Sequence, residues 1–355
     1  MTHPLLIYGA NGYTGRLVSA RAVDAGLRPV LAGRSRGSVA GLAGALGLAH
    51  RIADLGDADR LDAILGDVSV VLHCAGPFIH TALPMANACL RTGTHYLDIT
   101  GEIPVFEALG RLDAQAKRKK IVMLPGVGFD VVPSDCLAAH LVHRLPGATR
   151  LMLAFTGLSG GFSRGTSKTM VEYLGQDVLV RENHRLKPIR PGERVRRIHF
   201  GEVRRLSTAI SWGDVATAYV STGIPNIEVH MGVPDWVPAA LRLSRLASPI
   251  FRSRWMKRMI LHWIEKRVFG PTDQERSRSR SLLWGRAEGP GGAAVESRMS
   301  TPNGYSLTAA TAVEIARAAA DGRIPPGFQT PSLALGKDFI LTIEGCDRCD
   351  DRPWA

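Results

Sequence analysis

Cysteine is scarce in this sequence, with five residues among 355. A small, odd set argues against a framework of disulfide bonds and for a reducing compartment, so we expect a cytoplasmic protein. The pair Cys346 and Cys349 has CxxC spacing, but no second Cys or His pair accompanies it. A structural zinc site needs four ligands, so we expect no metal here. A solvated tail and a reactive surface dithiol are the two interpretations that stay open.

Long apolar runs are also missing. The most apolar region, residues 236–264, is interrupted by six arginines and lysines, so it does not predict a membrane-spanning helix. Residues 5–8 are apolar, but this run is too short for a secretory signal peptide and no basic segment precedes it. We therefore expect no such signal.

Acidic residues are outnumbered by basic ones. The sequence has 44 Lys and Arg against 32 Asp and Glu, which gives a formal net charge of +12. The basic residues concentrate in segments 181–205 and 242–286, and neither contains zinc-ligand pairs, a KH-type GxxG loop or an aromatic RNP motif. We therefore do not expect nucleic-acid binding. The charge predicts either a solvated basic face or attraction to anionic partners such as cofactor phosphates, acyl carriers or a lipid surface.

The first 135 residues alternate short apolar runs with helix-like segments. The runs are rich in Val, Ile and Leu and do not alternate with polar residues, as in strands that are buried on both faces of a parallel sheet. They cover residues 5–8, 29–32, 68–74, 96–99 and 121–124. The helical segments cover residues 15–25, 38–46, 58–65, 82–92 and 105–119. This repetition predicts a doubly wound α/β fold, a Rossmann domain.

The pattern changes after Pro146. Longer strands with polar alternation indicate an inserted α+β domain with a mixed, more antiparallel sheet, and they are predicted at residues 151–156, 195–199, 216–220 and 227–231. A basic amphipathic helix is then predicted over 236–268, with a break at Pro249. An alanine-rich helix over 305–320 opens with Ser306 as its cap.

These changes divide the chain into three parts. We expect a dinucleotide-binding Rossmann domain over residues 1–135 and a substrate or dimerisation domain over 136–300. We expect the segment 301–355 to pack back on the Rossmann domain through its helix.

The strongest motif is a glycine triplet between the first strand and the first helix. Gly9 permits the tight turn, Gly12 lets the backbone approach a pyrophosphate, and Gly15 lets the helix pack close to the sheet. The remaining residues of this GxxGxxG loop are candidates for the same cofactor contacts, and they include Asn11, Tyr13 and Thr14. Because helix N-termini attract phosphate, the loop predicts a bound dinucleotide.

The end of the second strand discriminates between the two nicotinamide cofactors. NAD sites place an acidic residue there to hold the ribose 2′-hydroxyl, whereas this chain has Arg34 and Ser35. A guanidinium can hold a 2′-phosphate with two hydrogen bonds, and the serine hydroxyl can add a third. We therefore expect NADP, with Arg34 as a plain surface charge being the alternative.

Later strand ends extend the expected cofactor cleft, because ligands of open sheets bind beyond the carboxyl ends of the strands. Asp54 follows the third strand, where it could meet the adenine amino group or be an ordinary loop aspartate. The turn after the fourth strand has small residues that would let a ribose lie on the backbone, and its candidates are Ala75, Gly76, Pro77 and Phe78.

Together these pieces resemble a known family. The order GANGYTGRLV, LAGRS, CAGPF, HYLDITGE, PGVGFDVVPSD and GTSKTM is similar to the saccharopine dehydrogenase-like oxidoreductases, and most to their trans-acting enoyl reductase branch. The resemblance implies a Rossmann domain, an inserted mixed-sheet domain and a helix that closes back on the first domain. It also implies NADP-linked hydride transfer, often on lipid or polyketide intermediates. The segment 181–205 matches nothing in the family pattern.

Five residues are candidates for the chemistry. Asp98 lies near a strand end and Glu102 in the following turn, and capping of the next helix is the alternative for both. The resemblance implies that the turn with Gly128 faces the nicotinamide, and that Asp130 positions substrate or a loop. Arg164 and Lys168 could neutralise a carboxylate, a phosphopantetheine phosphate or a developing enolate, or be exposed cations of a helix that begins at Thr166. Ser134 and Asp135 are expected to cap the helix that follows them.

Three functions remain in competition. The first is an NADP(H)-dependent oxidoreductase that acts on a C=C or C=O bond of a hydrophobic, lipid- or acyl-type substrate. The second is a non-catalytic NADP-binding scaffold or membrane-peripheral regulator, since no unambiguous proton donor stands at a strand end. An amino-acid imine reductase ranks third, because it needs a strong carboxylate clamp. The aromatic and basic residues of segment 251–264 fit membrane-surface contact, an acyl-pocket lid, a homodimer interface or ordinary packing.

Overall fold

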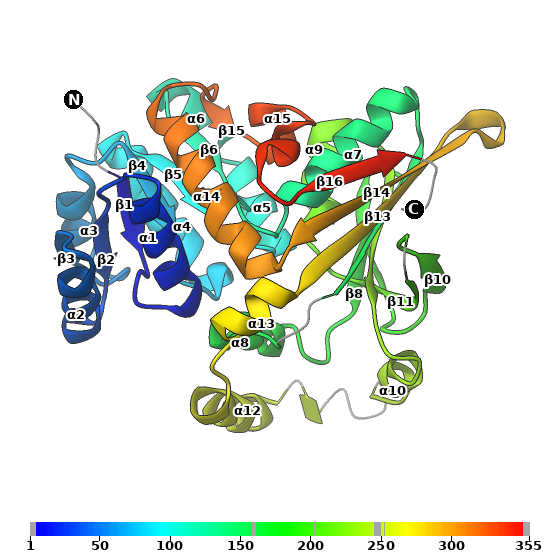
Figure 1. Cartoon of the computed structure of the whole chain (residues 1–355), viewed down its shortest axis with the longest axis horizontal. Helices are drawn as coiled ribbons and strands as arrows, with labels where there is room; N and C mark the ends of the chain where they lie inside the picture. Colours follow the sequence, from blue (N-terminus) through cyan, green and yellow to red (C-terminus); the bar gives the residue numbers. More distant parts are fainter. Residues whose placement is uncertain (1–4, 158–160, 202, 245–249, 252, 351–355) are drawn as a thin grey trace.

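Two β-sheets with their helices make up the structure (Figure 1). The computed structural model describes residues 5–157, 161–201, 203–244, 250–251 and 253–350. The first sheet has seven strands in the order β15-β6-β5-β4-β1-β2-β3, and every pairing in it is parallel. Its strands are β1 (Leu5–Tyr8), β2 (Val30–Gly33), β3 (His50–Ile52), β4 (Val70–His73), β5 (His95–Asp98), β6 (Val122–Leu124) and β15 (Gly327–Phe328).

Both faces of this sheet are buried, which explains the unbroken apolar runs. In β1, Leu5 and Ile7 belong to one apolar core while Leu6 and Tyr8 belong to the other. One face carries α1 (Tyr13–Asp24), α2 (Arg36–Leu46) and α14 (Gly304–Ala320). The other face carries α3 (Ala58–Leu65), α4 (Phe78–Thr92) and α6 (Asp113–Lys119), with α5 (Ile103–Gly110) contributing to both cores. The prediction of a doubly wound domain is confirmed.

The second sheet is mixed. It has nine strands, seven of them in the order β10-β11-β12-β7-β13-β14-β16, and β8 pairs with β12 and β9. Only β12 and β7 run parallel among these pairings. The strands are β7 (Arg150–Thr156), β8 (Val178–Glu182), β9 (Arg185–Ile189), β10 (Val195–His199), β11 (Arg204–Ile210), β12 (Asn226–Gly232), β13 (Arg280–Glu288), β14 (Ala294–Pro302) and β16 (Asp347–Asp350).

The helices of the second half connect the two sheets or extend beyond them. They are α7 (Val132–Arg144), α8 (Arg164–Glu172), α9 (Asp214–Thr222), α10 (Val237–Ser244), α12 (Arg254–Arg267), α13 (Asp273–Arg278) and α15 (Pro331–Leu335), with short 3₁₀ turns η2 (Pro290–Gly292) and η3 (Phe339–Thr342). Among the described residues, no helix combines the length and the apolar character that crossing a membrane requires.

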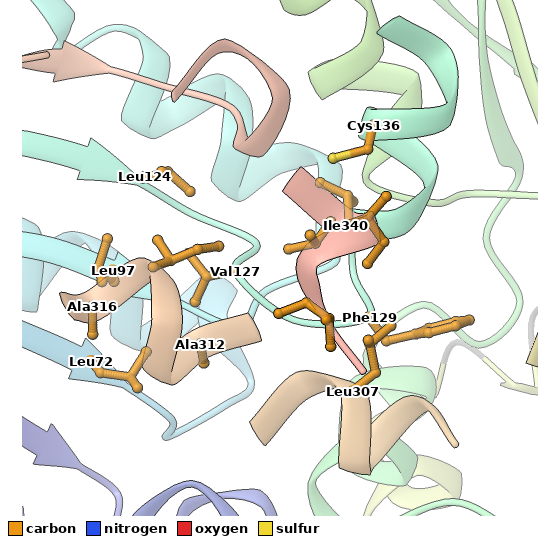
Figure 2. Packing of buried hydrophobic residues seen from close by; sticks show 14 of the residues in the cluster. Leu72, Leu97, Leu124, Val127, Phe129, Cys136, Leu307, Ala312, Ala316 and Ile340 are labelled. Atoms are coloured by element: carbon orange, nitrogen blue, oxygen red, sulfur yellow. The ribbon is translucent and has the colours of Figure 1, made fainter. Parts of the chain in front are cut away.

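One apolar cluster joins the two sheets through α14. Figure 2 shows Leu72 and Leu97 of neighbouring strands beside Ala312 and Ala316 of this helix. The same cluster continues through Phe129 and Leu307 of the loop and helix to Cys136 of α7 and Ile340 of η3. The expected return of the alanine-rich helix to the first domain is therefore confirmed. The segment after this helix contributes to both sheets, since β15 joins the first sheet and β16 joins the second.

Several sequence expectations for single elements are wrong. The polar alternation of residues 216–220 predicts a strand, but they lie in α9, which packs on α7 and ends at Thr222, with Gly223 as its C-cap in the left-handed region (φ 72°). The single helix expected over 105–119 is two helices, since α5 ends at Gly110 and α6 starts at Asp113. The helical region expected over 236–268 is present as α10 and α12, and the break expected at Pro249 lies outside the described residues.

Three expected caps are wrong as well. Asn303, and not Ser306, caps α14, because its side chain accepts a hydrogen bond from the Tyr305 N–H. Ser163 caps α8 by accepting from the Thr166 N–H. Ser134 and Asp135 lie inside the first turn of α7, and their side chains bind other elements instead: Ser134 donates to Asp214, and Asp135 accepts from Ser221 and from the Ser332 N–H.

Candidate functional site

The glycine loop joins β1 to α1 in the geometry that its glycines predict. Gly9 has a φ of 78°, and a Cβ there would lie 2.8 Å from the Ala75 Cβ. A Cβ on Gly15 would lie 2.3 Å from the Gly9 carbonyl oxygen, so only glycine lets α1 start this close to the strand. Gly12 precedes α1 as an exposed N-cap without a side-chain cap. The positive end of α1 is therefore open to an anion, which fits a dinucleotide pyrophosphate.

Arg34 and Asp54 follow two adjacent strands at the same edge. Arg34 is exposed directly after β2, and Ser35 is the N-cap residue of α2, with its hydroxyl 3.2 Å from Ser38 Oγ. Both charges act on Tyr8, because burial raises the pKa of its hydroxyl to about 12 while Asp54 raises that pKa and Arg34 lowers it. Asp54 Oδ1 accepts from the Gly56 N–H at 2.9 Å, which is a loop-turn contact. Among the described residues the Arg34 guanidinium has no hydrogen bond or ion pair, and it is exposed at the position where a 2′-phosphate would be recognised.

The turn after β4 presents backbone to the same edge. Gly76 is exposed, and Ala75 and Pro77 are half-buried. Phe78 is different, because its ring is buried against His73 in an edge-to-face contact with centroids 5.4 Å apart. The His73 ring has no hydrogen-bond partner among the described residues, and burial lowers the pKa of His73 to about 3. The first three residues can therefore contact a ribose, whereas Phe78 supports the turn from below.

Asp98 and Glu102 are both engaged by the fold. Asp98 accepts from the Tyr96 hydroxyl at 2.6 Å and from the N–H groups of Thr100 and Gly126 at 2.9 and 3.0 Å, and burial raises its pKa to about 6. Glu102 accepts from the N–H groups that open α4, at Phe78 (2.6 Å) and Ile79 (3.1 Å). Burial raises the pKa of Glu102. Each carboxylate therefore holds a strand-end turn in place, and Glu102 satisfies the start of α4 rather than that of α5.

Asp130 differs from these two carboxylates. It is half-buried, and its Oδ1 is shielded from water without a hydrogen-bond partner among the described residues. Burial raises the pKa of Asp130 to about 8, so this group holds its proton at neutral pH. The group lies beside the turn after β5, since a Cβ on Gly101 would be 2.5 Å from Asp130 Oδ2.

The loop that carries Asp130 is fixed by α14. The Phe129 N–H donates to Thr308 Oγ1 at 2.9 Å, and Thr311 Oγ1 donates to the Val127 carbonyl at 2.7 Å. A Cβ on Gly128 would lie 2.7 Å from Thr308 Cγ2, so this glycine makes room for α14. Contact of Gly128 with a nicotinamide would have to come from its other side.

Arg164 and Lys168 bind α12 and the segment after it. Arg164 Nε donates to the Val268 carbonyl at 3.1 Å, and its guanidinium lies 5.6 Å from the Phe269 ring centroid. Lys168 Nζ forms an ion pair with Glu265 at 2.7 Å. The two cations that were considered as a carboxylate clamp therefore have partners outside the sheet edge.

Tyr305, which the sequence did not single out, is central to this region. Its ring meets the Tyr13 ring of the glycine loop edge to face, with centroids 5.0 Å apart. Its hydroxyl accepts from the Ser163 N–H at 2.6 Å and lies 3.1 Å from Thr166 Oγ1. Tyr13 in turn donates to the Pro271 carbonyl at 2.5 Å. An aromatic residue at the first turn of a returning helix was the only sequence signal for this contact.

Helix α8 lies across the carboxyl edge of the first sheet. At its start it is bound to Tyr305, and at its end the Tyr173 hydroxyl donates to Glu102 Oε2 at 3.0 Å. Its outer side is covered by α12, whose Lys257 donates to the Glu172 carbonyl at 2.7 Å. The candidate site is therefore bordered by the carboxyl edge of the first sheet and by α8, which α14 and Glu102 hold at its two ends.

Metal ligands do not assemble in the part of the chain that the structure describes, where no group of three or more His, Cys, Asp or Glu side chains could hold an ion. Cys346 is buried, and burial raises its pKa to about 12. Cys349 lies in β16 opposite Arg298 of β14. Both thiols are thus part of the packed second sheet or its border rather than a free tail.

A family model decides what the first domain is. Residues 5–124 match the saccharopine dehydrogenase NADP-binding domain. Over these residues the first domain is similar to that family's cofactor-binding domain. The match covers β1 to β6, including the open glycine loop and the Arg34 strand end, and it supports a nicotinamide dinucleotide as the cofactor.

Relatives of the chain carry names from the same group. A Mycobacterium tuberculosis protein provisionally named as a trans-acting enoyl reductase is 34% identical over 184 residues, which cover 48% of this chain and 44% of that protein. A trans-acting enoyl reductase of Mycobacterium leprae is 33% identical over 151 residues, which cover 40% of this chain and 36% of the relative. The matched part thus spans less than half the length of these relatives.

The fold of the whole chain is that of a saccharopine dehydrogenase. The apo saccharopine dehydrogenase (L-Glu forming) of Saccharomyces cerevisiae superposes with a TM-score of 0.66 at 13% identity and covers 98% of this chain and 99% of its own. The resemblance to saccharopine dehydrogenase-like oxidoreductases is confirmed.

Proposed function

We propose that the chain is an NADP(H)-dependent oxidoreductase that transfers hydride to a C=C or C=O bond of a hydrophobic, lipid- or acyl-type substrate. The observation that carries this proposal is the open start of α1 between Gly9 and Gly15, with Arg34 exposed at the next strand end. NADPH would supply the hydride, and this chain would bind and orient the cofactor along the sheet edge. The glycine loop would hold the pyrophosphate, and Ala75 and Gly76 would border the nicotinamide ribose.

The choice of NADP over NAD depends on Arg34. An acidic residue at this place would repel a 2′-phosphate, whereas an unpaired guanidinium can form two charge-assisted hydrogen bonds with it. The family name points to the same cofactor.

The proton that a reduction requires is best supplied from Asp130. It is the carboxyl group at this edge that is held neutral at neutral pH and has an oxygen without a partner among the described residues. Asp98 and Glu102 use their oxygens to hold turns, so they act as positioning groups. A neutral carboxyl beside a nicotinamide can donate a hydrogen bond or a proton to the reduced substrate.

The substrate class is supported by the relatives, whose names describe enoyl reduction. An amino-acid imine is disfavoured because Arg164 and Lys168, the candidate carboxylate clamp, are bound to Val268 and Glu265. The exposed aromatic and basic side chains of α12, the helix that packs on α8, also fit a hydrophobic substrate better than a small zwitterion.

Cofactor titration tests the first half of the proposal. Fluorescence titration with NADPH and NADH should show that Arg34→Ala weakens NADPH binding by about 10- to 100-fold, the value of one or two charge-assisted hydrogen bonds, with little change for NADH. Arg118→Ala, an exposed arginine on α6, is the matched control and should change neither affinity. Equal losses for both cofactors with Arg34→Ala would refute the assignment of NADP.

Turnover tests the second half. NADPH oxidation should occur with acyl thioesters whose acyl chain carries an enoyl C=C or a keto C=O group. Asp130→Asn should lower kcat while NADPH affinity is kept. A non-catalytic NADP-binding scaffold is the second candidate, and the saturation of Asp98 and Glu102 by internal hydrogen bonds favours it. Tight NADPH binding without oxidation across enoyl, keto and imine substrates would support that candidate.

A further inference from the structure

The outer side of α12 combines aromatic and basic side chains. Trp255, Met259 and Trp263 follow one another at four-residue intervals and are 64%, 48% and 60% exposed. Arg258, His262 and Lys266 are exposed between and beside them. We call these six residues the α12 face. Large apolar side chains are normally turned inward in a helix of a globular protein, so this arrangement needs an explanation.

The helix is held by its opposite side. Ile264 is buried, Lys257 donates to the Glu172 carbonyl, and Glu265 pairs with Lys168 of α8. The α12 face therefore points away from the body of the protein on a helix whose orientation is fixed. A frayed or mobile helix would not present such a constant face.

Neighbouring segments extend the apolar part of this surface. Phe269, just after α12, is 70% exposed, and at α10 Trp236 and Leu243 are 69% and 68% exposed. Figure 1 shows α12 below α8 and α10 below β11, both on the lower side of the molecule in this view. Phe269 therefore continues the exposed apolar surface at the end of α12, and α10 adds exposed apolar residues of its own.

The charge of α12 selects the partner. α12 contains five Lys and Arg residues and one Glu, and that glutamate is already paired with Lys168. A symmetric dimer through the α12 face would oppose two identical basic surfaces, which is unfavourable. An anionic bilayer supplies negative headgroups for the basic residues and an interface in which tryptophan side chains are stable.

We propose that the α12 face docks on an anionic membrane surface, with Trp255 and Trp263 at the level of the lipid headgroups. This goes beyond the proposed reductase function and does not depend on it. Because α12 packs on α8, which borders the candidate site, docking would hold that site next to the membrane, where acyl chains are concentrated.

Vesicle co-sedimentation of the full chain tests the docking. The protein should bind vesicles made of equal parts phosphatidylglycerol and phosphatidylcholine, bind pure phosphatidylcholine weakly, and be released by salt. Each basic residue at an anionic surface strengthens partitioning about fivefold, so Arg258→Glu with Lys266→Glu should weaken it at least about 25-fold. The matched control is Arg118→Glu with Lys119→Glu on α6, which is remote from this face and should leave binding within about twofold.

The aromatic residues are tested separately. Trp255→Ala with Trp263→Ala should weaken binding to the same vesicles, and lipids brominated near the headgroup should quench tryptophan fluorescence in the wild type more than in this variant. Leu333→Ala, an exposed apolar residue on α15, is the control. NADPH binding measured on every variant shows whether it is folded.

Three results would overturn the proposal. The first is a wild type that does not sediment with anionic vesicles. The second is an equal loss of binding in the α6 charge control, which would indicate adsorption by net charge alone. The third is a dimer in analytical ultracentrifugation that the tryptophan variant dissociates, since the α12 face would then be covered by a second copy.

Discussion

Replacing Asp130 with asparagine should flatten the pH dependence of the unfolding free energy. Burial raises the pKa of Asp130 from 3.8 to about 8 in the folded protein. Between these two values the folded protein holds a proton that the unfolded chain has released, so stability falls as the pH rises. Asparagine binds no proton in either state and lacks this loss.

One proton sets the size of the effect. The unfolding free energy changes by about 1.4 kcal/mol per pH unit while the folded state holds one proton more than the unfolded state. From about pH 5 to about pH 6.5, well inside the interval, the wild type should therefore lose about 2 kcal/mol relative to Asp130→Asn. Burial also raises the pKa of Asp98 to about 6, but this residue is present in both proteins and cancels in the difference.

Urea unfolding followed by tryptophan fluorescence measures this difference at each pH. Asp177→Asn is a suitable control, because Asp177 is exposed and its replacement should shift all points equally or not at all. Parallel curves of unfolding free energy against pH for the wild type and Asp130→Asn would refute the reasoning. So would a wild type whose unfolding free energy rises relative to that of Asp130→Asn as the pH rises.

Three further changes probe the glycine loop, the attachment of α8 and the turn that holds the start of α4. Gly15→Ala should abolish NADPH binding in a titration, because its Cβ would lie 2.3 Å from the Gly9 oxygen, whereas Gly41→Ala, in open space on α2, should raise stability by about 1 kcal/mol. Tyr305→Phe removes the acceptor of the Ser163 N–H and should cost about 1 kcal/mol in thermal unfolding, with faster proteolysis of α8; unchanged proteolysis would mean that Tyr305 does not hold this helix. Glu102→Gln turns an amide toward the N–H groups that open α4 and should cost about 1–3 kcal/mol, visible in urea unfolding at neutral pH.

Local patterns in the sequence were sufficient for the first domain and for its loop. The run Leu5–Tyr8 is apolar at every position because both of its faces are buried. Gly12 and Gly15 are required by contacts within the loop itself, whereas Gly9 also makes room for Ala75 of the turn after β4. Arg34 could be identified for the same reason, since it directly follows β2.

The second sheet was harder to predict because polar and charged residues interrupt the apolar pattern of its strands. β13 and β14 pair over nine residues each, yet their sequences mix Arg, Glu, Ser and Gly with apolar residues and show no clean alternation. Arg286 in β13 forms ion pairs with Glu288 and Glu296, which a search for apolar strands does not detect. In α9 the polar alternation of residues 216–220 favoured a strand, but these residues form a helix that packs on α7.

The site shows the same limit. Asp98 and Glu102 were noticed for their positions, but only the structure shows that their oxygens are used by Tyr96, Gly126 and the start of α4. The contact between Tyr305 and Ser163 joins residues 142 positions apart, so no local pattern could reveal it.

The short connection from β14 to α14 limits how far the two halves of the molecule can move relative to each other. Asn303 alone separates the last residue of a second-sheet strand from the first residue of a helix that packs on the first sheet. Tyr13 and Pro271 add a second bond between the same halves. The two halves of the molecule are thus connected at two places, and a hinge-like opening of one half against the other would disrupt both connections. We therefore expect coenzyme and substrate to bind without a change in the relative orientation of the two sheets.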